Sequence, residues 1–190
     1  KRQGITASSL EYSNILISHV TVTGVNLRGI HAVSRESIID CCSVKVTGLE
    51  GIYGGPVKSC MASLCGGPGI FAYSIVSDSK GESVGGNGIE CRGNVRNSHG
   101  ISTNGDGIFA SRNIINSYGE SSEGNGIYCL GDVQNCWGRS DGSDADGIWG
   151  RNISNSTGIT LGDDGIDALS TISYSHGSSF GTGDGLECPI

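Results

Sequence analysis

The chain has 190 residues, of which 12 are basic, 19 are acidic and 33 are glycine, and its net charge is −7. The length suits a single domain, 1–190, and the acidic balance argues against a nucleic-acid partner, because nucleic acids are bound by basic patches. No apolar run reaches the roughly 18 residues that a membrane-spanning helix needs. We therefore expect one domain with neither a nucleic-acid partner nor a membrane span.

The first units along the chain are rich in β-branched residues. Residues 14–24 have the sequence NILISHVTVTG, and residues 37–48 have the sequence SIIDCCSVKVTG. Apolar and polar residues alternate in both, which predicts short β-strands. From Gly69 onward the units become shorter, more polar and more regular.

A Gly-Ile step recurs through the whole chain. It occurs at Gly4, Gly29, Gly51, Gly69, Gly88, Gly107, Gly126, Gly147 and Gly165, and as Gly-Leu at Gly185. Units of about nineteen residues that recur from end to end predict a solenoid, in which stacked Ile and Val side chains form one thin core. We expect Asp or Asn before each glycine to form a bend, and the glycine to permit that bend.

Two motifs carry a resemblance to a known family. They are the GDGI and GNGI steps, and the pieces VRNS, IINS, VQNC and ISNS at residues 95–98, 114–117, 133–136 and 153–156. With these motifs the chain resembles the pectate-lyase-like family of right-handed parallel β-helices. The drift in unit length also favours a right-handed helix over a left-handed one built from regular hexapeptides. The expected fold is all-β, a right-handed parallel β-helix (solenoid) of about nine to ten coils.

The cysteines fall in columns of small residues. Cys91, Cys129 and Cys188 share a position with alanines, and Cys41, Cys60 and Cys136 share another with serines. Both columns should point inward, where a free cysteine behaves as a small apolar residue. Disulfides between Cys60 and Cys65 or between Cys129 and Cys136 are the alternative.

The residue after each Ile should point outward, and this column is the candidate ligand- or partner-binding site. Its aromatic members are Tyr53, Phe71, Phe109, Tyr128 and Trp149. Stacking between coils, contact with another protein and stacking on carbohydrate remain alternatives. A second outward column is expected to be a solvated face; its members are His19, Cys42, Met61, Lys80, His99, Tyr118, Trp137, Thr157 and His176.

Two further columns should lie in turns. The first is Glu50, Pro68, Asn87, Asp106, Asn125, Asp146, Asp164 and Asp184. Turn chemistry explains it, with Ca²⁺ bound by its carboxylates as the alternative; no other cofactor is expected. The second column is a predicted side-chain ladder of Asp40, Ser59, Asp78, Asn97, Asn116, Asn135 and Asn155.

No catalytic constellation stands out. The acidic residues lie about one per coil, the arginines are scattered, and pairs such as Glu90 with Arg112 are isolated. The predicted function is therefore a non-catalytic structural rod, extracellular or at the cell surface. It would associate with itself head to tail, and laterally, into a filament, or form the shaft of a fibre or adhesin. The alternative is a β-helix protein that binds or cleaves a polysaccharide, as a lyase or hydrolase.

The two ends of the sequence fit either of two arrangements. The chain begins in pattern at KRQGI and stops within a unit at GDGLECPI. Unpaired strand edges would template pairing with further strands. Residues 1–190 are thus expected to be either one subunit of a filament or a segment of a longer solenoid.

Overall fold

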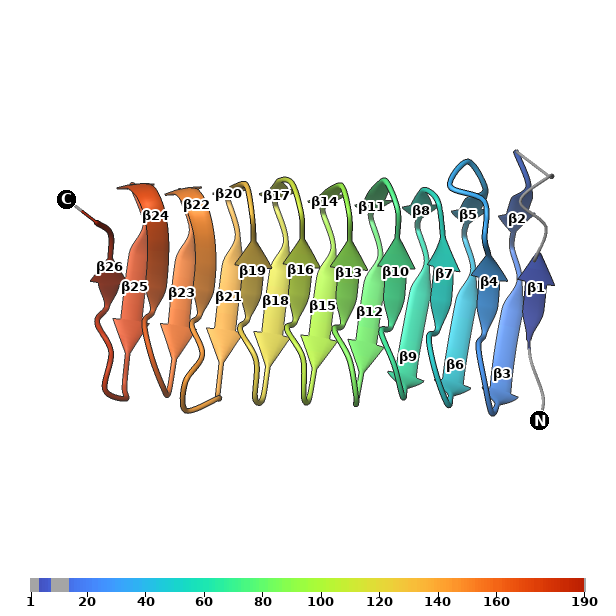
Figure 1. The fold of residues 1–190 in the computed structure, drawn as a ribbon, viewed down its shortest axis with the longest axis horizontal. Coiled ribbons are helices and arrows are strands. Elements are labelled where there is room, and N and C mark those ends of the chain that lie inside the picture. The colour runs from blue at the N-terminus through green and yellow to red at the C-terminus, as the bar shows by residue number, and fades with distance from the viewer. Residues whose placement is uncertain (1–3, 8–13, 190) are drawn as a thin grey trace.

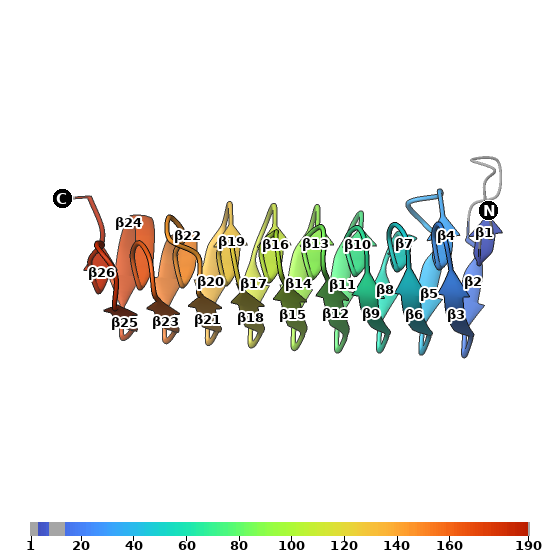
Figure 2. The same ribbon diagram turned by 90° about the horizontal axis from the view of Figure 1, so that it is seen from below.

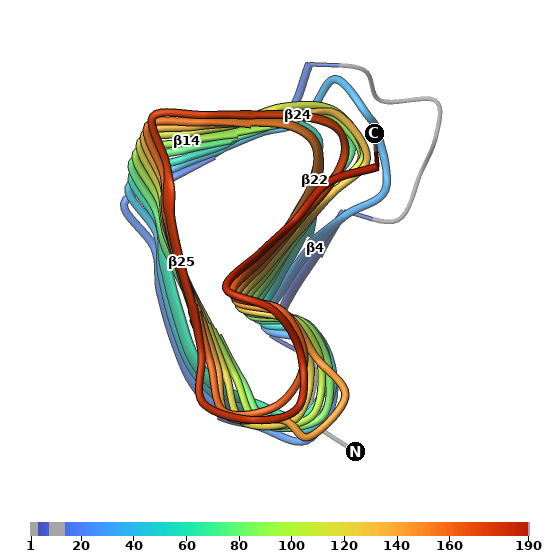
Figure 3. The same ribbon diagram turned by 90° about the vertical axis from the view of Figure 1, so that its left-hand side faces the viewer.

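The structure is a computed structural model that describes residues 4–7 and 14–189. The proposed edge residues 1–3 and residue 190 lie outside this range. The described residues form parallel strands and no helix, stacked coil upon coil along one axis (Figure 1). Seen from the C-terminal end, the chain runs counterclockwise as it approaches the viewer (Figure 3), so the solenoid is right-handed. The predicted fold class is confirmed.

The Gly-Ile strands form the first wall. They are β1 (Ile5–Ala7), β4 (Ile30–Ala32), β7 (Ile52–Gly54), β10 (Ile70–Ala72), β13 (Ile89–Cys91), β16 (Ile108–Ala110), β19 (Ile127–Cys129), the first parts of β22 (Ile148–Ser154) and β24 (Ile166–Ser173), and β26 (Leu186–Glu187). Each Ile pairs in register with the Ile of the next coil, as Ile89 does with Ile108. The Gly-Ile repeat therefore marks the coil repeat.

The second wall belongs to the same sheet and follows a bend. Its strands are β2 (Leu16–Ser18), β5 (Ile38–Asp40), β8 (Val57–Lys58), β11 (Ile75–Ser77), β14 (Asn94–Arg96), β17 (Ile114–Ile115), β20 (Asp132–Gln134) and the last parts of β22 and β24. In the last two full coils one continuous strand covers both walls.

The third wall is a separate nine-stranded sheet. Its strands are β3 (Thr21–Val25), β6 (Ser43–Thr47), β9 (Met61–Cys65), β12 (Lys80–Ser83), β15 (His99–Ser102), β18 (Tyr118–Ser121), β21 (Trp137–Ser140), β23 (Thr157–Thr160) and β25 (His176–Ser179). Figure 2 shows this row along one side of the rod.

The core is a stack of single residues from each wall. The first wall contributes a column of isoleucines from Ile30 to Ile166, each fully buried, and the second contributes residues such as Val95 and Ile114. Alanines and the cysteines Cys91 and Cys129 fill the predicted small inward column. Because each layer is one side chain thick, every coil depends on its neighbours for burial.

Left-handed residues make the corner between the second and third walls. Nine of them have φ between 47° and 56°, namely His19, Cys41, Ser59, Asp78, Asn97, Asn116, Asn135, Asn155 and Tyr174. The predicted ladder is wrong at Asp40, which lies in β5, whereas Cys41 takes the corner. The buried neighbour is consequently Cys42, and Cys41 is exposed. Two adjacent cysteines made the register of this coil ambiguous in the sequence.

The buried Ser/Cys column that follows the corner satisfies the backbone. The N–H of Cys60 donates to Ser79 Oγ at 3.1 Å, and that hydroxyl donates to the carbonyl of Ser77 at 2.7 Å. A thiol serves equally, since Cys136 Sγ contacts the carbonyl of Gln134 at 3.1 Å. All eight cysteines are free, so neither suggested disulfide is present.

The glycines of the repeat have a different role from the predicted one. Gly24 is the described glycine with positive φ, so the Gly-Ile glycines do not provide left-handed bends. Instead the first wall indents toward the third wall (Figure 3). A Cβ at Gly107 would overlap the backbone of Glu120, and one at Gly119 would overlap the carbonyl oxygen of Gly126. Glycine is needed there because two backbones pass in direct contact.

Candidate functional site

The outward column of the first wall brings the five predicted aromatic residues into one line. Tyr53 stacks on Phe71 with centroids 4.7 Å apart, and Phe109, Tyr128 and Trp149 form a second stack with centroid distances of 5.5 and 4.5 Å. The planes within each stack differ by 15° or less. Glu90 pairs with Phe71 on one side and Phe109 on the other, and so separates the two stacks.

This stacking decides which part of each ring is available. In-register neighbours on parallel strands lie about 4.8 Å apart, so the rings lie face to face along the rod axis. Each face within a stack is covered by the next ring, and Phe71, which the sequence placed in an outward column, is buried between Tyr53, Tyr73 and Arg92. Flat stacking of a sugar on these rings is therefore restricted to the ends of a stack.

An aromatic residue absent from the predicted column completes the first stack. Tyr73 packs edge-on against Tyr53 and Phe71, at centroid distances of 5.5 and 5.3 Å, and its hydroxyl hydrogen-bonds that of Tyr53. The guanidinium groups of Arg35 and Arg92 lie 5.1 and 5.2 Å from the Tyr73 ring centroid. Burial and the hydrogen bond shared with Tyr73 raise the pKa of Tyr53 to about 12. The only sequence signal for this packing is that Tyr73 lies two residues after Phe71.

The second outward column lies on the third wall and follows the predicted register from Met61 onward. Earlier in the chain the prediction is wrong, because Ser43 pairs with Met61, whereas Cys42 is buried and His19 is at a corner. In the described coils this column contains a third stack. Tyr118 and Trp137 lie 4.3 Å apart and 5° from parallel, and His99 packs edge-on against Tyr118.

The corner asparagines form a hydrogen-bonded ladder beside this stack. Asn97 donates to Asp78 Oδ1 at 3.1 Å, Asn116 to Asn97 at 3.3 Å, and Asn135 to Asn116 at 3.1 Å. A shallow depression of about 1090 Å³, largely open to solvent, runs between the ladder and the column from Met61 to Thr157, and we refer to it as the groove. A surface that the sequence suggested to be merely solvated is thus a shallow groove with side-chain amides along one border and Tyr118 and Trp137 on the other.

The residues before the repeating glycines form a second ladder. Each side-chain oxygen accepts the backbone N–H of the equivalent residue in the next coil, at distances of 2.6–3.1 Å from Asn87 to Asp184. Burial raises the pKa of Asp106 to about 6 and that of Asp146 to about 7. These carboxyls therefore hold the turns of adjacent coils together, and burial makes their ionisation unfavourable.

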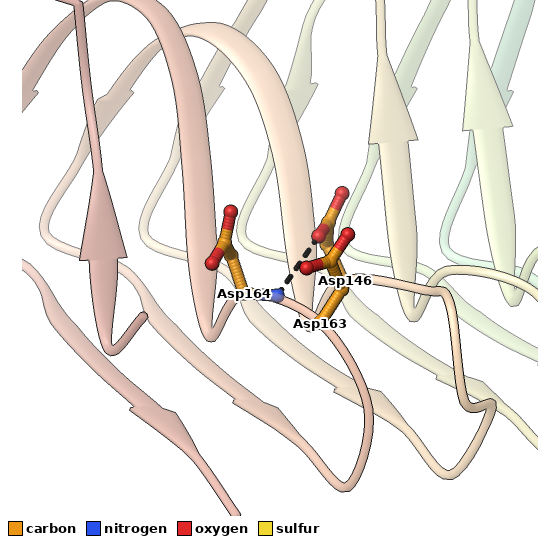
Figure 4. A group of neighbouring side chains, drawn as sticks. All are labelled: Asp146, Asp163 and Asp164. Carbon is orange, nitrogen blue, oxygen red and sulfur yellow. Dashed lines mark hydrogen bonds between the residues drawn. The ribbon is translucent and has the colours of Figure 1, made fainter. Parts of the chain in front are cut away.

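Three carboxylates of this region lie close together. Asp146 and Asp164 are buried members of the ladder, and Asp163 is exposed beside them (Figure 4). Each offers one oxygen within 4.8 Å of the others. Carboxylate oxygens are ligands that Ca²⁺ prefers. Asp146 and Asp164 of the acidic turn column, together with the adjacent Asp163, could hold a calcium ion.

Glu90 and the buried cysteines are further reactive groups among the described residues. Glu90 has its hydrogen-bond partner in Asn87, and no ion pair joins it to Arg112 in the described range. Burial raises the pKa of Cys60 and Cys129 to about 12, which keeps both thiols protonated. No helix long and apolar enough to span a membrane occurs among the described residues.

These features define a right-handed parallel β-helix with stacked aromatic and amide columns. Comparison of the chain with family models, with curated proteins and with solved structures found no match. The resemblance to pectate-lyase-like proteins thus rests on the sequence motifs, and the coil geometry supports the β-helix shape alone.

Proposed function

We propose that this chain is a non-catalytic structural rod that associates with itself outside the cell, as a filament or as the shaft of a fibre or adhesin. The observation that carries this proposal is the pairing of polar and aromatic side chains between coils. The carboxyls and amides of the turns accept backbone N–H groups of the next coil, and the rings stack on each other. The buried carboxyls Asp106, Asp146 and Asp164 are thus engaged in holding coils together.

Such pairing favours axial stiffness. Bending the rod would separate the ladder hydrogen bonds and the stacked rings on one side of it at every coil. Each hydrogen bond contributes about 1 kcal/mol and each ring pair about 0.5–1.5 kcal/mol, and the contributions recur along the rod. A stiff rod of this kind suits a role as a mechanical support or a spacer.

The charge distribution supports end-to-end association. Residues 1–95 contain eight basic and seven acidic residues, and residues 96–190 contain four basic and twelve acidic residues. The net charge is therefore +1 in the first half and −8 in the second, which makes the rod electrostatically polar. Contact between the acidic half of one rod and the less acidic half of another reduces like-charge repulsion, and salt should modulate it.

Electron microscopy and sedimentation velocity of the purified chain test this proposal. We expect particles one rod wide whose length grows with protein concentration. Monodisperse single rods at the highest attainable concentration, at both low and high salt, would contradict self-association. Rods that bend freely in the images would contradict the shaft role as well.

A second candidate function is binding or cleavage of an acidic polysaccharide at the first-wall column of Tyr53, Phe71, Phe109, Tyr128 and Trp149. The observation in its favour is the end of the second stack. Trp149 is followed in register by Asp167, so one indole face is not covered by a ring, and the carboxylates of Asp146 and Asp164 lie in the adjacent turns. Binding and cleavage of polygalacturonate, with and without Ca²⁺, tests it. Replacing Tyr128 and Trp149 together by alanine should abolish any binding.

A further inference from the structure

The groove of the third wall contains a point where its aromatic contacts stop. Trp137 stacks on Tyr118 on its N-terminal side, and its neighbour on the other side is Thr157. A threonine side chain is too small to cover an indole, so part of one indole face stays open. His176 follows Thr157 in register, two strand spacings or about 9.5 Å beyond Trp137. That separation leaves room for one further ring above Thr157.

The amide ladder stops at the same level. Asn135 donates to Asn116, but no hydrogen bond joins Asn155 to Asn135 in the described coils. The Asn135 oxygen, the Asn155 amide, the Thr157 hydroxyl and the Trp137 indole N–H have no protein partner among the described residues. An open ring face and a set of free donors and acceptors thus meet at one place in the groove.

We propose that this place is a binding subsite for a neutral sugar, and that a linear neutral glycan lies from there along the groove toward His99. A sugar ring offers an apolar C–H face to the indole, and its hydroxyls need both donors and acceptors, which a primary amide supplies. Among the Asp, Glu, Lys and Arg residues, the acidic Asp78 and the basic Lys80 line the groove, and their formal charges are opposite. The lining therefore favours an uncharged polymer over an anionic one.

This inference goes beyond the structural rod and concerns a different wall from the candidate site at Trp149. A rod could carry the groove whether or not it polymerises. The chain has two tryptophans, Trp137 and Trp149, so replacing either by phenylalanine leaves a single reporter of one face.

Fluorescence titration of the Trp149→Phe variant with cellohexaose, xylohexaose, mannohexaose and laminarihexaose is the first test. At least one of these neutral hexasaccharides should give a saturable change in Trp137 emission at millimolar concentration or below. The Trp137→Phe variant should give no such change, and polygalacturonate should not bind the groove. If none of the four hexasaccharides changes Trp137 emission, the proposal fails.

The Thr157→Tyr variant is the matched second test, since it fills the subsite instead of deleting part of it. A tyrosine there extends the ring stack over Trp137, so melting should stay cooperative at an unchanged or higher temperature. Affinity for the hexasaccharide should fall at least tenfold, and Asn155→Ala should weaken binding to a smaller extent. Undiminished binding by Thr157→Tyr would overturn the proposal. So would concentration-dependent pairing of rods that Thr157→Tyr abolishes, because the groove would then be a contact between copies.

Discussion

The first coils and the later coils fill the same cross-section in two different ways. In β3 and β6 the inward position facing the Gly-Ile step is occupied by Val22 and Val44, whereas from β12 onward it is glycine. A Cβ at Gly29 would meet the Val44 side chain, but one at Gly107 would meet the backbone of Glu120. The early coils are therefore closed by side chains and the later coils by direct backbone contact.

The corner differs between the two regions as well. The early coils place His19, Cys41 and Ser59 in the left-handed conformation, while the coils from Asp78 to Asn155 use Asp and Asn. Asparagine tolerates positive φ and also extends the ladder. The regular region thus gains its uniform coil length from backbone contact and ladders, whereas the early region can vary because side chains adapt.

The most destabilising change should be a side chain introduced where the later coils close by backbone contact. Shortening a side chain that closes an early coil should cost less. Gly119→Val should destabilise the rod by about 3 kcal/mol or more, because the new side chain collides with the carbonyl of Gly126 and with Ile127. Val44→Ala in the early region should cost less, on the order of 2 kcal/mol, since it leaves a cavity without a collision. Chemical denaturation followed by circular dichroism measures both. Equal stability of Gly119→Val and wild type would show that the later coils are not closed by backbone contact.

An intermediate effect is expected from pH, and it belongs to the later coils. Burial raises the pKa of Asp146 from 3.8 to about 7, so the folded state holds a proton that the unfolded chain loses near pH 4. Stability from this group is fully present below pH 4 and is lost as the pH rises to about 7. Asp146→Asn keeps the acceptor oxygen and removes the charge. A shift of this size corresponds to at most about 4 kcal/mol. Because solvent screens part of the effect, the variant should be about 2 kcal/mol more stable than wild type at pH 8, with no gain at pH 4.

Thermal melting across the pH range should measure the difference in stability between wild type and Asp146→Asn. Protonation of His31 and His99 destabilises the folded state in acid, because burial lowers the pKa of both. Their contribution cancels when wild type is compared with Asp146→Asn. A constant difference between the two proteins at all pH values would contradict the pKa assignment to Asp146.

The same variant tests the expectation of calcium at the acidic turn. Ca²⁺ bound by Asp146, Asp163 and Asp164 should raise the melting temperature of the wild-type protein at pH 8, and EDTA should reverse the rise. Asp146→Asn should show a much smaller rise. If calcium did not change the melting temperature of the wild type, the acidic residues would have a structural role in the turns and would not bind calcium.

The smallest effect should come from placing asparagine, the residue of most later corners, at the early corners Cys41 and Ser59. Cys41→Asn together with Ser59→Asn should stabilise the rod by about 0.5–1 kcal/mol, because both positions have positive φ and would extend the ladder to Asp78. Asn116→Ser, which interrupts the ladder, should cost a similar amount. Guanidinium denaturation resolves changes of this size when the slope stays constant. A loss of stability in the double variant would show that the early corners exclude a ladder.

Much of the fold was predictable because a solenoid repeats one local pattern. The spacing of the Gly-Ile steps predicted the register of the first wall from Ile5 to Leu186, including the drift in coil length. The same pattern placed Tyr53 and Trp149 in one outward column and Cys91 in an inward one. It failed at Cys41 and Cys42, where two identical residues fit the same column one position apart.

The groove was beyond what the sequence could show. Its two walls, the corner asparagines and the column of Tyr118 and Trp137, were both recognised as columns. Their distance from each other across a corner depends on the left-handed turn at each asparagine, which pattern alone does not report. The partners of Tyr73 were missed for the same reason, since side-chain packing between different positions of the coil has no signature in the repeat.

The repeat was enough to predict the architecture, the coil length and most members of each column, because period and alternation follow directly from side-chain direction on stacked strands. Three matters became visible only in the folded coil. They are that glycine is required for backbone contact and not for bending, that ring faces are covered by neighbouring coils, and that both contacts end beside Trp137. All three depend on distances between segments that meet only when the coil closes, and a linear pattern carries no information about those distances.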